Sequence, residues 1–139
     1  MGRLSVFAVI LIAGLVLWWQ QPDSDEHLPS GASSTTTEPL VLSSVEVRDL
    51  DGRVAWRGDV DLAPVLARIE AGERDPHRND GSVFQNREGR LPQRPRGHYR
   101  EYVVRTPGIR HAGPQRLVLG ADGEIYYTAD HYRSFQRLR

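Results

Sequence analysis

The sequence predicts an α+β domain, in which one helix packs on a small antiparallel β-sheet, with a separate apolar helix before it at the N-terminus. Three observations support this fold class: an amphipathic stretch over residues 62–71, a series of short β-type runs over residues 83–138, and an apolar run over residues 4–19. At 139 residues the chain has room for one small domain with extensions. We expect that domain to cover residues 44–139.

Residues 4–19 are apolar except for Ser5 and Gly14, and Arg3 precedes them. The length of the run lies between that of a signal-peptide core and that of a full membrane span, which needs about 17–25 residues. Because acidic residues follow the run, the positive-inside rule predicts that the remainder of the chain leaves the cytoplasm. We expect residues 1–19 to be a membrane anchor, or alternatively a cleaved signal peptide, on an exported protein at the periplasmic or extracellular face.

Residues 20–43 are rich in Ser, Thr, Pro and acids, which is typical of a flexible tether. Beyond them, residues 45–48 and 53–56 alternate in character on either side of a turn signal at residues 49–52. This pattern predicts a β-hairpin, to which the sequence assigns no function.

The predicted helix covers residues 62–71. Asp61 can cap its start, Pro64 is tolerated in the first turn, and Gly72 can end it. Its apolar residues recur at positions i, i+3, i+4 and i+7, which forms a stripe that can pack on a sheet: Leu62, Val65, Leu66 and Ile69.

The sheet that this helix would cover is predicted from five runs, at residues 83–84, 99–104, 116–119, 124–127 and 134–138. Residues typical of turns lie between several of them. With the helix on one face of the sheet, the other is left as a concave, arginine-lined face for a ligand.

Charge and composition narrow the function. Lysine is absent, and residues 73–139 carry thirteen arginines against eight acids, although the whole chain has a net charge of zero. A basic half made of arginine favours a polyanionic partner, because guanidinium groups pair with phosphate. Cysteine is absent, which excludes disulfides and thiolate metal sites, and the five histidines lack metal-ligand spacing. We therefore expect no metal or other cofactor.

Residues 83–92 combine an aromatic ring, two amides, a guanidinium and a carboxylate in one short polar run. Asn86 and Gly89 tolerate positive φ, so the backbone here can curl and turn its N–H groups toward a ligand. The Glu88 carboxylate beside such donors suits guanine, whose N1 and N2 both donate hydrogen bonds. The alternative is a solvated surface loop between strands.

A carboxylate and an imidazole further along the chain could supply a base and an acid. Strand alternation places Glu101 on one face with Tyr99 and Val103, where it would be partly desolvated, and Arg116 on a neighbouring strand is its expected partner. His131 lies in a loop before the last strand, and with Glu101 it would form a pair usable near neutral pH. The alternatives are a structural ion pair and a structural histidine.

Four motifs in a fixed order carry a resemblance to a known family. Residues 84–88 read Phe-Gln-Asn-Arg-Glu, residues 99–104 read Tyr-x-Glu-Tyr-x-Val, residues 106–108 read Thr-Pro-Gly, and residues 126–135 read Tyr-Tyr-Thr-x-Asp-His-Tyr-x-x-Phe. Over roughly residues 80–138 the chain is similar to the microbial guanyl-specific ribonucleases, the superfamily that includes barnase.

The resemblance implies a metal-independent endoribonuclease that cleaves single-stranded RNA after guanosine, first to a 2′,3′-cyclic phosphate and then to a 3′-phosphate. It implies that Glu101 is the base, His131 the acid, and Arg116 a phosphate-binding cation. The residues that it implies for substrate binding are Phe84 as a ring beside the base, Gln85, Asn86 and Arg87 through backbone contacts to guanine, Glu88 at the N–H edge of guanine, and Tyr132 near the phosphate.

One departure from the family pattern concerns the phosphate site. Family members have another arginine about four residues before the one matched by Arg116, where this sequence has Ala112. Arg110 or His111 could substitute for it, although adjacent positions on an extended strand face opposite ways. The departure predicts reduced activity, and it leaves as an alternative a catalytically weakened RNA- or protein-binding module at the cell envelope. We expect a monomer, and the family suggests a small acidic, barstar-like inhibitor as a further partner.

Overall fold

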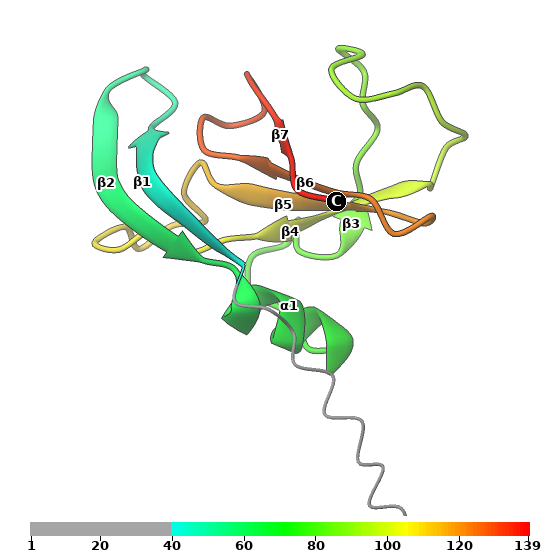
Figure 1. Ribbon diagram of the computed structural model, residues 1–139, viewed down its shortest axis with the longest axis horizontal. Helices are drawn as coiled ribbons and strands as arrows, with labels where there is room; N and C mark the ends of the chain where they lie inside the picture. The colour runs from blue at the N-terminus through cyan, green and yellow to red at the C-terminus, as the bar shows by residue number, and fades with distance from the viewer. Residues whose placement is uncertain (1–39) are drawn as a thin grey trace, which may run out of the picture. The chain divides into compact units, whose positions relative to one another are not determined.

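The computed structural model describes residues 40–139, which form one helix and two antiparallel sheets (Figure 1). The helix is α1 (Ala63–Glu70), and the two-stranded sheet pairs β1 (Val41–Arg48) with β2 (Val54–Asp61). The strands of the five-stranded sheet lie side by side in chain order: β3 (Ser82–Val83), β4 (Tyr99–Val103), β5 (Arg116–Gly120), β6 (Ile125–Thr128) and β7 (Gln136–Arg137). The α+β class and the antiparallel sheet are thereby confirmed.

The apolar run at residues 4–19 and the tether as far as residue 39 lie outside the described residues. Among residues 40–139, no helix is long and apolar enough to cross a membrane.

The predicted hairpin is present and is longer than expected. Its turn is closed by a hydrogen bond of 2.8 Å from the Gly52 N–H to the Asp49 carbonyl. β1 begins at Val41, so the folded domain starts before residue 44, where the sequence pattern placed it. The reason is that Leu42 is buried against the main core, whereas the serines that follow it, Ser43 and Ser44, continue the polar composition of the predicted tether.

The helix also matches its prediction apart from its first and last residues, since it ends at Glu70 rather than residue 71. It begins at Ala63 rather than residue 62, and the Asp61 carboxylate accepts a hydrogen bond of 2.9 Å from the Ala63 N–H. After its end, Gly72 adopts a φ of 69°, and its N–H donates to the Ile69 carbonyl. A glycine at this position suits the left-handed backbone that ends many helices.

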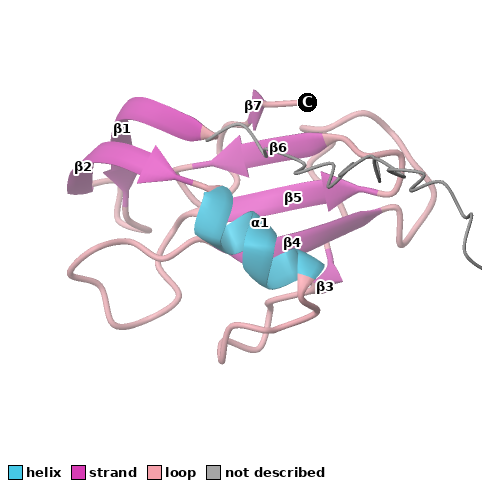
Figure 2. Ribbon diagram, turned by 60° about the horizontal axis from the view of Figure 1, so that its bottom comes forward, coloured by secondary structure: helices cyan, strands magenta, loops and turns pink. Residues whose placement is uncertain are grey.

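One face of the five-stranded sheet packs against α1, which crosses it (Figure 2). The hairpin also contributes buried side chains to this core. Its buried members are Leu42, Val60, Leu62, Val104, Leu117, Ile125 and Tyr127. Val65, Leu66 and Ile69 pack against it from the helix, which confirms the predicted apolar stripe.

The opposite face of the sheet carries a smaller cluster that supports the candidate site. Its buried members are Leu91, Tyr99, Val118 and Tyr126, with Phe84 and Phe135 packed against them. Glu101 lies on the same face, because it is the direct partner of Val118 across β4 and β5.

Candidate active site

Glu101 lies in the middle of β4, and only 8% of it is exposed. Its carboxylate accepts a hydrogen bond of 3.1 Å from the Ser82 hydroxyl and another from the Tyr132 hydroxyl. Ser82 reaches Glu101 because β3 pairs these two residues directly. The predicted desolvation of Glu101 is confirmed, and its two hydroxyl partners leave further lone pairs of the carboxylate available to a ligand.

Arg116 occupies the same sheet face, since it is the direct partner of Val103 across β4 and β5. The predicted ion pair between Arg116 and Glu101 is wrong: within residues 40–139, Arg116 makes its hydrogen bonds to backbone carbonyls instead. Strand alternation correctly predicted that the two residues share a face, but it did not show that the chain just before Arg116 curls its carbonyls toward the guanidinium.

Three carbonyl groups hold one end of the Arg116 guanidinium. Nη1 donates to Gly113 and Gln115 at 2.7 Å each and to Ala112 at 3.2 Å. Nε is buried without a hydrogen-bond partner in the described part of the chain. A buried N–H group without a partner is costly, so this donor is suited to an anionic acceptor.

His131 lies in the loop between β6 and β7, where it has a φ of 55° and Tyr132 has a φ of 67°. The left-handed region costs a non-glycine residue roughly 1–2 kcal/mol. Hydrogen bonds from the His131 N–H to the Pro114 carbonyl (3.1 Å) and from the Tyr132 N–H to the Thr128 hydroxyl (3.0 Å) hold the loop in this conformation. Among residues 40–139 the His131 imidazole itself has no hydrogen-bond partner, so a ligand could exchange a proton with it.

The pKa of His131 lies below its ordinary value. Burial is the main cause, and the positive charge of Arg116 acts in the same direction, while the negative charge of Glu101 opposes them. An anionic phosphate beside the ring would favour the protonated imidazole and raise this pKa.

Tyr132 connects the loop between β6 and β7 to the rest of the site. Its ring stacks on Phe84 with 5.4 Å between centroids, and the Arg116 guanidinium carbon lies 5.8 Å from its centroid. Burial raises the pKa of the Tyr132 hydroxyl far above its ordinary value, and the hydrogen bond to Glu101 adds to this effect. The hydroxyl was predicted to approach a phosphate, but here it donates to Glu101.

The predicted base-binding loop is closed by the side chain of Asn86. Its amide donates to the Leu91 carbonyl at 2.7 Å, and its oxygen accepts the Leu91 N–H at 2.9 Å. Asn86 and Gly89 have φ values of 49° and 62°, as their residue types predicted. In the described residues no hydrogen bond engages the backbone N–H groups of residues 85–88, which remain available to a ligand.

This loop borders a groove of about 490 Å³, which is lined by residues 84–88, by Arg78 and Asn79, and by Glu101. The groove therefore brings the predicted base-binding residues and the predicted catalytic base together. Phe84 lines the groove, and its ring is supported by Tyr132 and Phe135. Glu88 is exposed at the groove, where it could reach a bound base.

The structure does not bring every predicted residue to the site. Arg110 is exposed on the loop between β4 and β5, outside the groove. His111 uses its Nδ1 to accept the Gly113 N–H at 3.1 Å, so it turns toward its own loop. Neither residue lines the groove.

Three residues of the site were missed from the sequence: Ser82, Arg78 and Asn79. Ser82 contacts Glu101 only through the register of β3 and β4, which join residues 19 positions apart. Pairing between strands this distant leaves no local pattern in the sequence.

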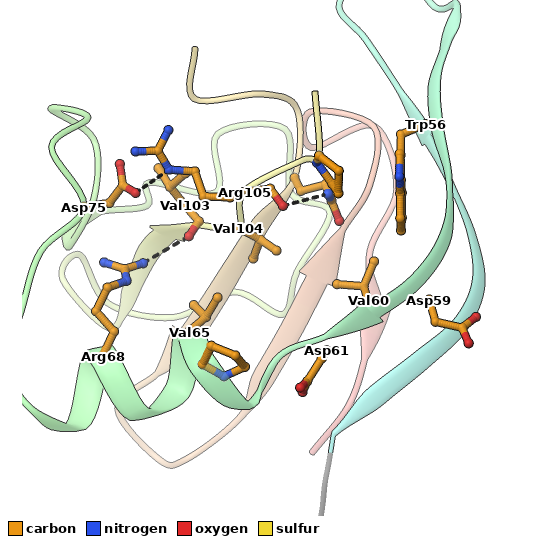
Figure 3. A pocket seen from close by; sticks show the side chains of 13 residues that line it. Trp56, Asp59, Val60, Asp61, Val65, Arg68, Asp75, Val103, Val104 and Arg105 are labelled. Atoms are coloured by element: carbon orange, nitrogen blue, oxygen red, sulfur yellow. Dashed lines mark hydrogen bonds and ion pairs between the residues drawn. The ribbon is translucent and has the colours of Figure 1, made fainter. Parts of the chain in front are cut away.

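A second groove, of about 420 Å³, lies between the hairpin, α1 and the end of β4 (Figure 3). Its walls are mostly apolar, and the ion pair between Arg105 and Asp75 lies at its edge. It contains none of the predicted site residues, so we assign the candidate site to the first groove.

Among residues 40–139, the one group that could hold a metal ion is His98, Asp122 and Glu124, whose ligand atoms lie within 4.8 Å of one another. The Arg94 guanidinium already lies 3.5 Å from Glu124 and 3.9 Å from Asp122. A cationic side chain thus balances these carboxylates, and the group shares no residue with the groove.

Known proteins resemble the part of the chain that contains this site. A family model described as ribonuclease matches residues 61–139. Guanyl-specific ribonuclease St of Saccharopolyspora erythraea is 50% identical over 68 residues, which are 49% of this chain and 67% of that protein. Guanyl-specific ribonuclease Sa3 of Kitasatospora aureofaciens is 51% identical over 74 residues, 52% of each chain. A solved structure of ribonuclease Sa2 in complexes with mononucleotides matches with a TM-score of 0.51 at 44% identity, covering 53% of this chain and 77% of that one.

Proposed function

The chain belongs to the ribonuclease family, and from this membership together with its site we infer that it is a guanyl-specific endoribonuclease. Its substrate is RNA. The finer assignments, namely the roles of single residues, the preference for single strands and the independence from metal ions, are proposed from the geometry of the groove.

We propose that Glu101 takes the proton from the 2′-hydroxyl of a guanosine. The 2′-oxygen then attacks the phosphorus and forms a 2′,3′-cyclic phosphate, while the bond from phosphorus to the 5′-oxygen breaks and His131 protonates the departing oxygen. In the second step His131 takes a proton from water, Glu101 protonates the departing 2′-oxygen, and a 3′-phosphate remains. DNA lacks the nucleophile and is not cleaved.

Arg116 is proposed to bind the phosphate as its charge increases in the transition state. Its Nε lacks a hydrogen-bond partner in the described chain, and its Nη1 is fixed by carbonyls, so the guanidinium is oriented before the substrate binds. A donor that needs no reorganisation stabilises developing charge most effectively.

Guanine is proposed to lie in the groove beside Phe84, with the N–H groups of residues 85–88 as donors to its acceptors and Glu88 as acceptor from its N1 and N2. The base must be unpaired to present this edge. The single observation that carries the whole proposal is that Glu101 lines this groove and also accepts the hydrogen bond of Tyr132, whose ring lies beside the Arg116 guanidinium.

The test is cleavage of a short single-stranded RNA with one G, in EDTA, by the full-length protein and its Glu101→Ala and His131→Ala variants. The wild type is expected to cut after G and release a cyclic phosphate, with each variant slower by about 10²–10⁴-fold because it lacks its proton-transfer group. If folded wild type cuts no faster than the variants, the assignment of the base and the acid is wrong.

We also propose, from the apolar run at residues 4–19, that the enzyme is exported and acts at the cell envelope or outside the cell. A monomer, and inhibition by a small acidic protein that covers the arginine-containing groove, fit this proposal. Fractionation of cells that express the full chain would test its export, and size-exclusion chromatography would test whether it is a monomer.

A further inference from the structure

The β1–β2 hairpin precedes almost all of the residues that match the ribonuclease family, 61–139, and yet it touches the loop that carries His131. The Arg48 N–H donates to the Ala129 carbonyl at 3.0 Å, and the Arg133 guanidinium donates to the Leu50 carbonyl at 3.0 Å. Figure 1 shows the hairpin rising beside the loop between β6 and β7. Its two contacts therefore lie on either side of His131 in the sequence.

The loop needs such support because its conformation is strained. His131 and Tyr132 are consecutive non-glycine residues with φ values of 55° and 67°. Strained residues persist only where their surroundings hold them. Within the loop, the Asp130 carboxylate accepts hydrogen bonds from the N–H and the hydroxyl of Ser134. From outside, the loop is held by the Pro114 carbonyl and by the two hairpin contacts.

The hairpin also brings a charge to the acid. Asp49 lies between Arg48 and Leu50, the two hairpin residues whose backbone groups contact the loop of His131. Charged side chains from several elements act on the pKa of His131, among them Arg116 from β5, Arg133 from the loop itself, Glu101 from β4, and Asp49 from the hairpin turn. The two arginines disfavour the protonated ring, whereas Glu101 and Asp49 favour it. Asp49 is half-buried, and its carboxylate accepts the Leu50 N–H at 2.7 Å, which orients it.

We propose that the β1–β2 hairpin is a positioning element for the catalytic acid: its turn clamps the loop at Ala129 and Arg133, and it brings the negative charge of Asp49 to the loop that carries His131. The proposal rests on the role of His131 in the proposed function. It assigns a function to the hairpin, almost all of which lies outside the residues that match the ribonuclease family.

The charge is tested with Asp49→Asn, and Asp51→Asn is the matched control. Both substitutions remove one negative charge from the same turn. The Asp49 carboxylate accepts the Leu50 N–H and the Asp51 carboxylate accepts the Arg53 N–H, and the amide oxygen of asparagine can accept the same hydrogen bond in each case. The histidine resonances of full-length protein are titrated by NMR, and the pH profile of kcat/KM is measured on a GpU dinucleotide.

In Asp49→Asn, the His131 midpoint and the basic limb of the profile are both expected to move down by about 0.3–0.6 in pH, the effect of one charge several ångströms away in a partly solvated site. Asp51→Asn should move them by less than half as much. If the two variants give the same midpoint, Asp49 has no special effect on His131 and this part of the proposal is overturned.

The clamp is tested with Arg133→Met, which removes the donor to Leu50, and with Arg137→Met as the control for charge and size. Arg137 is exposed on β7 and donates to the Arg139 carbonyl. Relative to the control, Arg133→Met is expected to lower kcat three- to ten-fold and leave KM within two-fold, since a misplaced acid affects chemistry more than binding. Equal kcat values in the two variants would overturn the clamp.

The NMR titration separates this inference from the proposed function. If wild type fails to cleave RNA, the role of His131 as acid is lost, yet the titration still decides whether Asp49 acts on the imidazole. If wild type cleaves RNA and the titration shows no difference between Asp49→Asn and Asp51→Asn, the enzyme assignment stands and the hairpin charge does not contribute.

Discussion

At the scale of single residues, the hydrogen-bond partners of Glu101 and Arg116 determine which charges of the site are available to a ligand. The Glu101 carboxylate binds two hydroxyl groups, and Arg116 binds carbonyls of its own preceding loop. Because the two charges do not neutralise each other in an ion pair, the positive charge of Arg116 remains available to a phosphate. In the proposed reaction, the Tyr132 hydroxyl keeps Glu101 oriented until a 2′-hydroxyl shares the carboxylate.

The alanine at position 112 leads to a prediction at this scale. Ala112→Arg is expected to raise kcat/KM on a GpU dinucleotide by on the order of 10²-fold, because a second oriented cation would bind the phosphate in the transition state. The contact from Arg116 uses the backbone carbonyl of Ala112, so the substitution does not remove it.

The control for this gain is Ala121→Arg, which adds the same charge in the exposed turn between β5 and β6. If both variants raise kcat/KM equally, the effect is one of general charge. If neither raises it, Arg116 alone provides the phosphate contact that this site needs.

At the scale of elements, a buried carboxylate fastens α1 to the sheet. Asp80 accepts hydrogen bonds from both terminal nitrogens of Arg68 on α1, at 2.7 and 3.1 Å, and from the Val103 N–H on β4 at 2.8 Å. Its side chain is 1% exposed. The hydrogen bonds of Asp80 thus hold α1 against β4, the strand that carries Glu101.

Asp80→Asn is expected to lower the free energy of unfolding by about 3–5 kcal/mol, because the amide leaves the Arg68 charge without its partner and turns a donor toward other donors. Urea unfolding followed by circular dichroism measures the loss. Asp59→Asn is the control, since the exposed Asp59 accepts one N–H from Ser44. Similar losses in the two variants would show that Asp80 does not anchor the helix.

At the scale of the whole molecule, titrating groups on several elements make stability depend on pH. Burial alone would raise the pKa of Asp80 and Asp130, but hydrogen bonds from Arg68 and from Ser134, respectively, outweigh it and lower both below the ordinary 3.8. The pKa of His131 is lowered below 6.5, chiefly by burial. For all three groups the unfolded chain binds protons more readily, so acid favours unfolding.

The melting temperature of full-length protein is therefore expected to be highest above pH 6.5, to fall slightly as His131 titrates below that value, and to fall steeply below pH 3.8 as the aspartates titrate. His131→Ala should remove the first, small decrease and leave the second. A melting temperature that rises between pH 7 and pH 5, or that stays constant down to pH 2, would contradict this assignment.

Much of the fold could be predicted because its signals are local. The stripe of α1, the glycine after it, the turns and the alternation along β4 each depend on residues within one or two turns or a few strand positions. The same locality explains the correct prediction of the turn at residues 86–89, where Asn86 and Gly89 adopt the positive φ that their residue types favour.

The sequence by itself determined the fold class, the order of the elements and the ribonuclease motifs, since these follow from residue type and spacing. Only the tertiary structure decided that Arg116 binds carbonyls rather than Glu101, that Ser82 and Tyr132 hold the Glu101 carboxylate, and that the hairpin reaches the loop of His131. These contacts join residues brought together by strand register and packing. Register between distant strands depends on the whole core, so the neighbours of a side chain are fixed only when the chain folds.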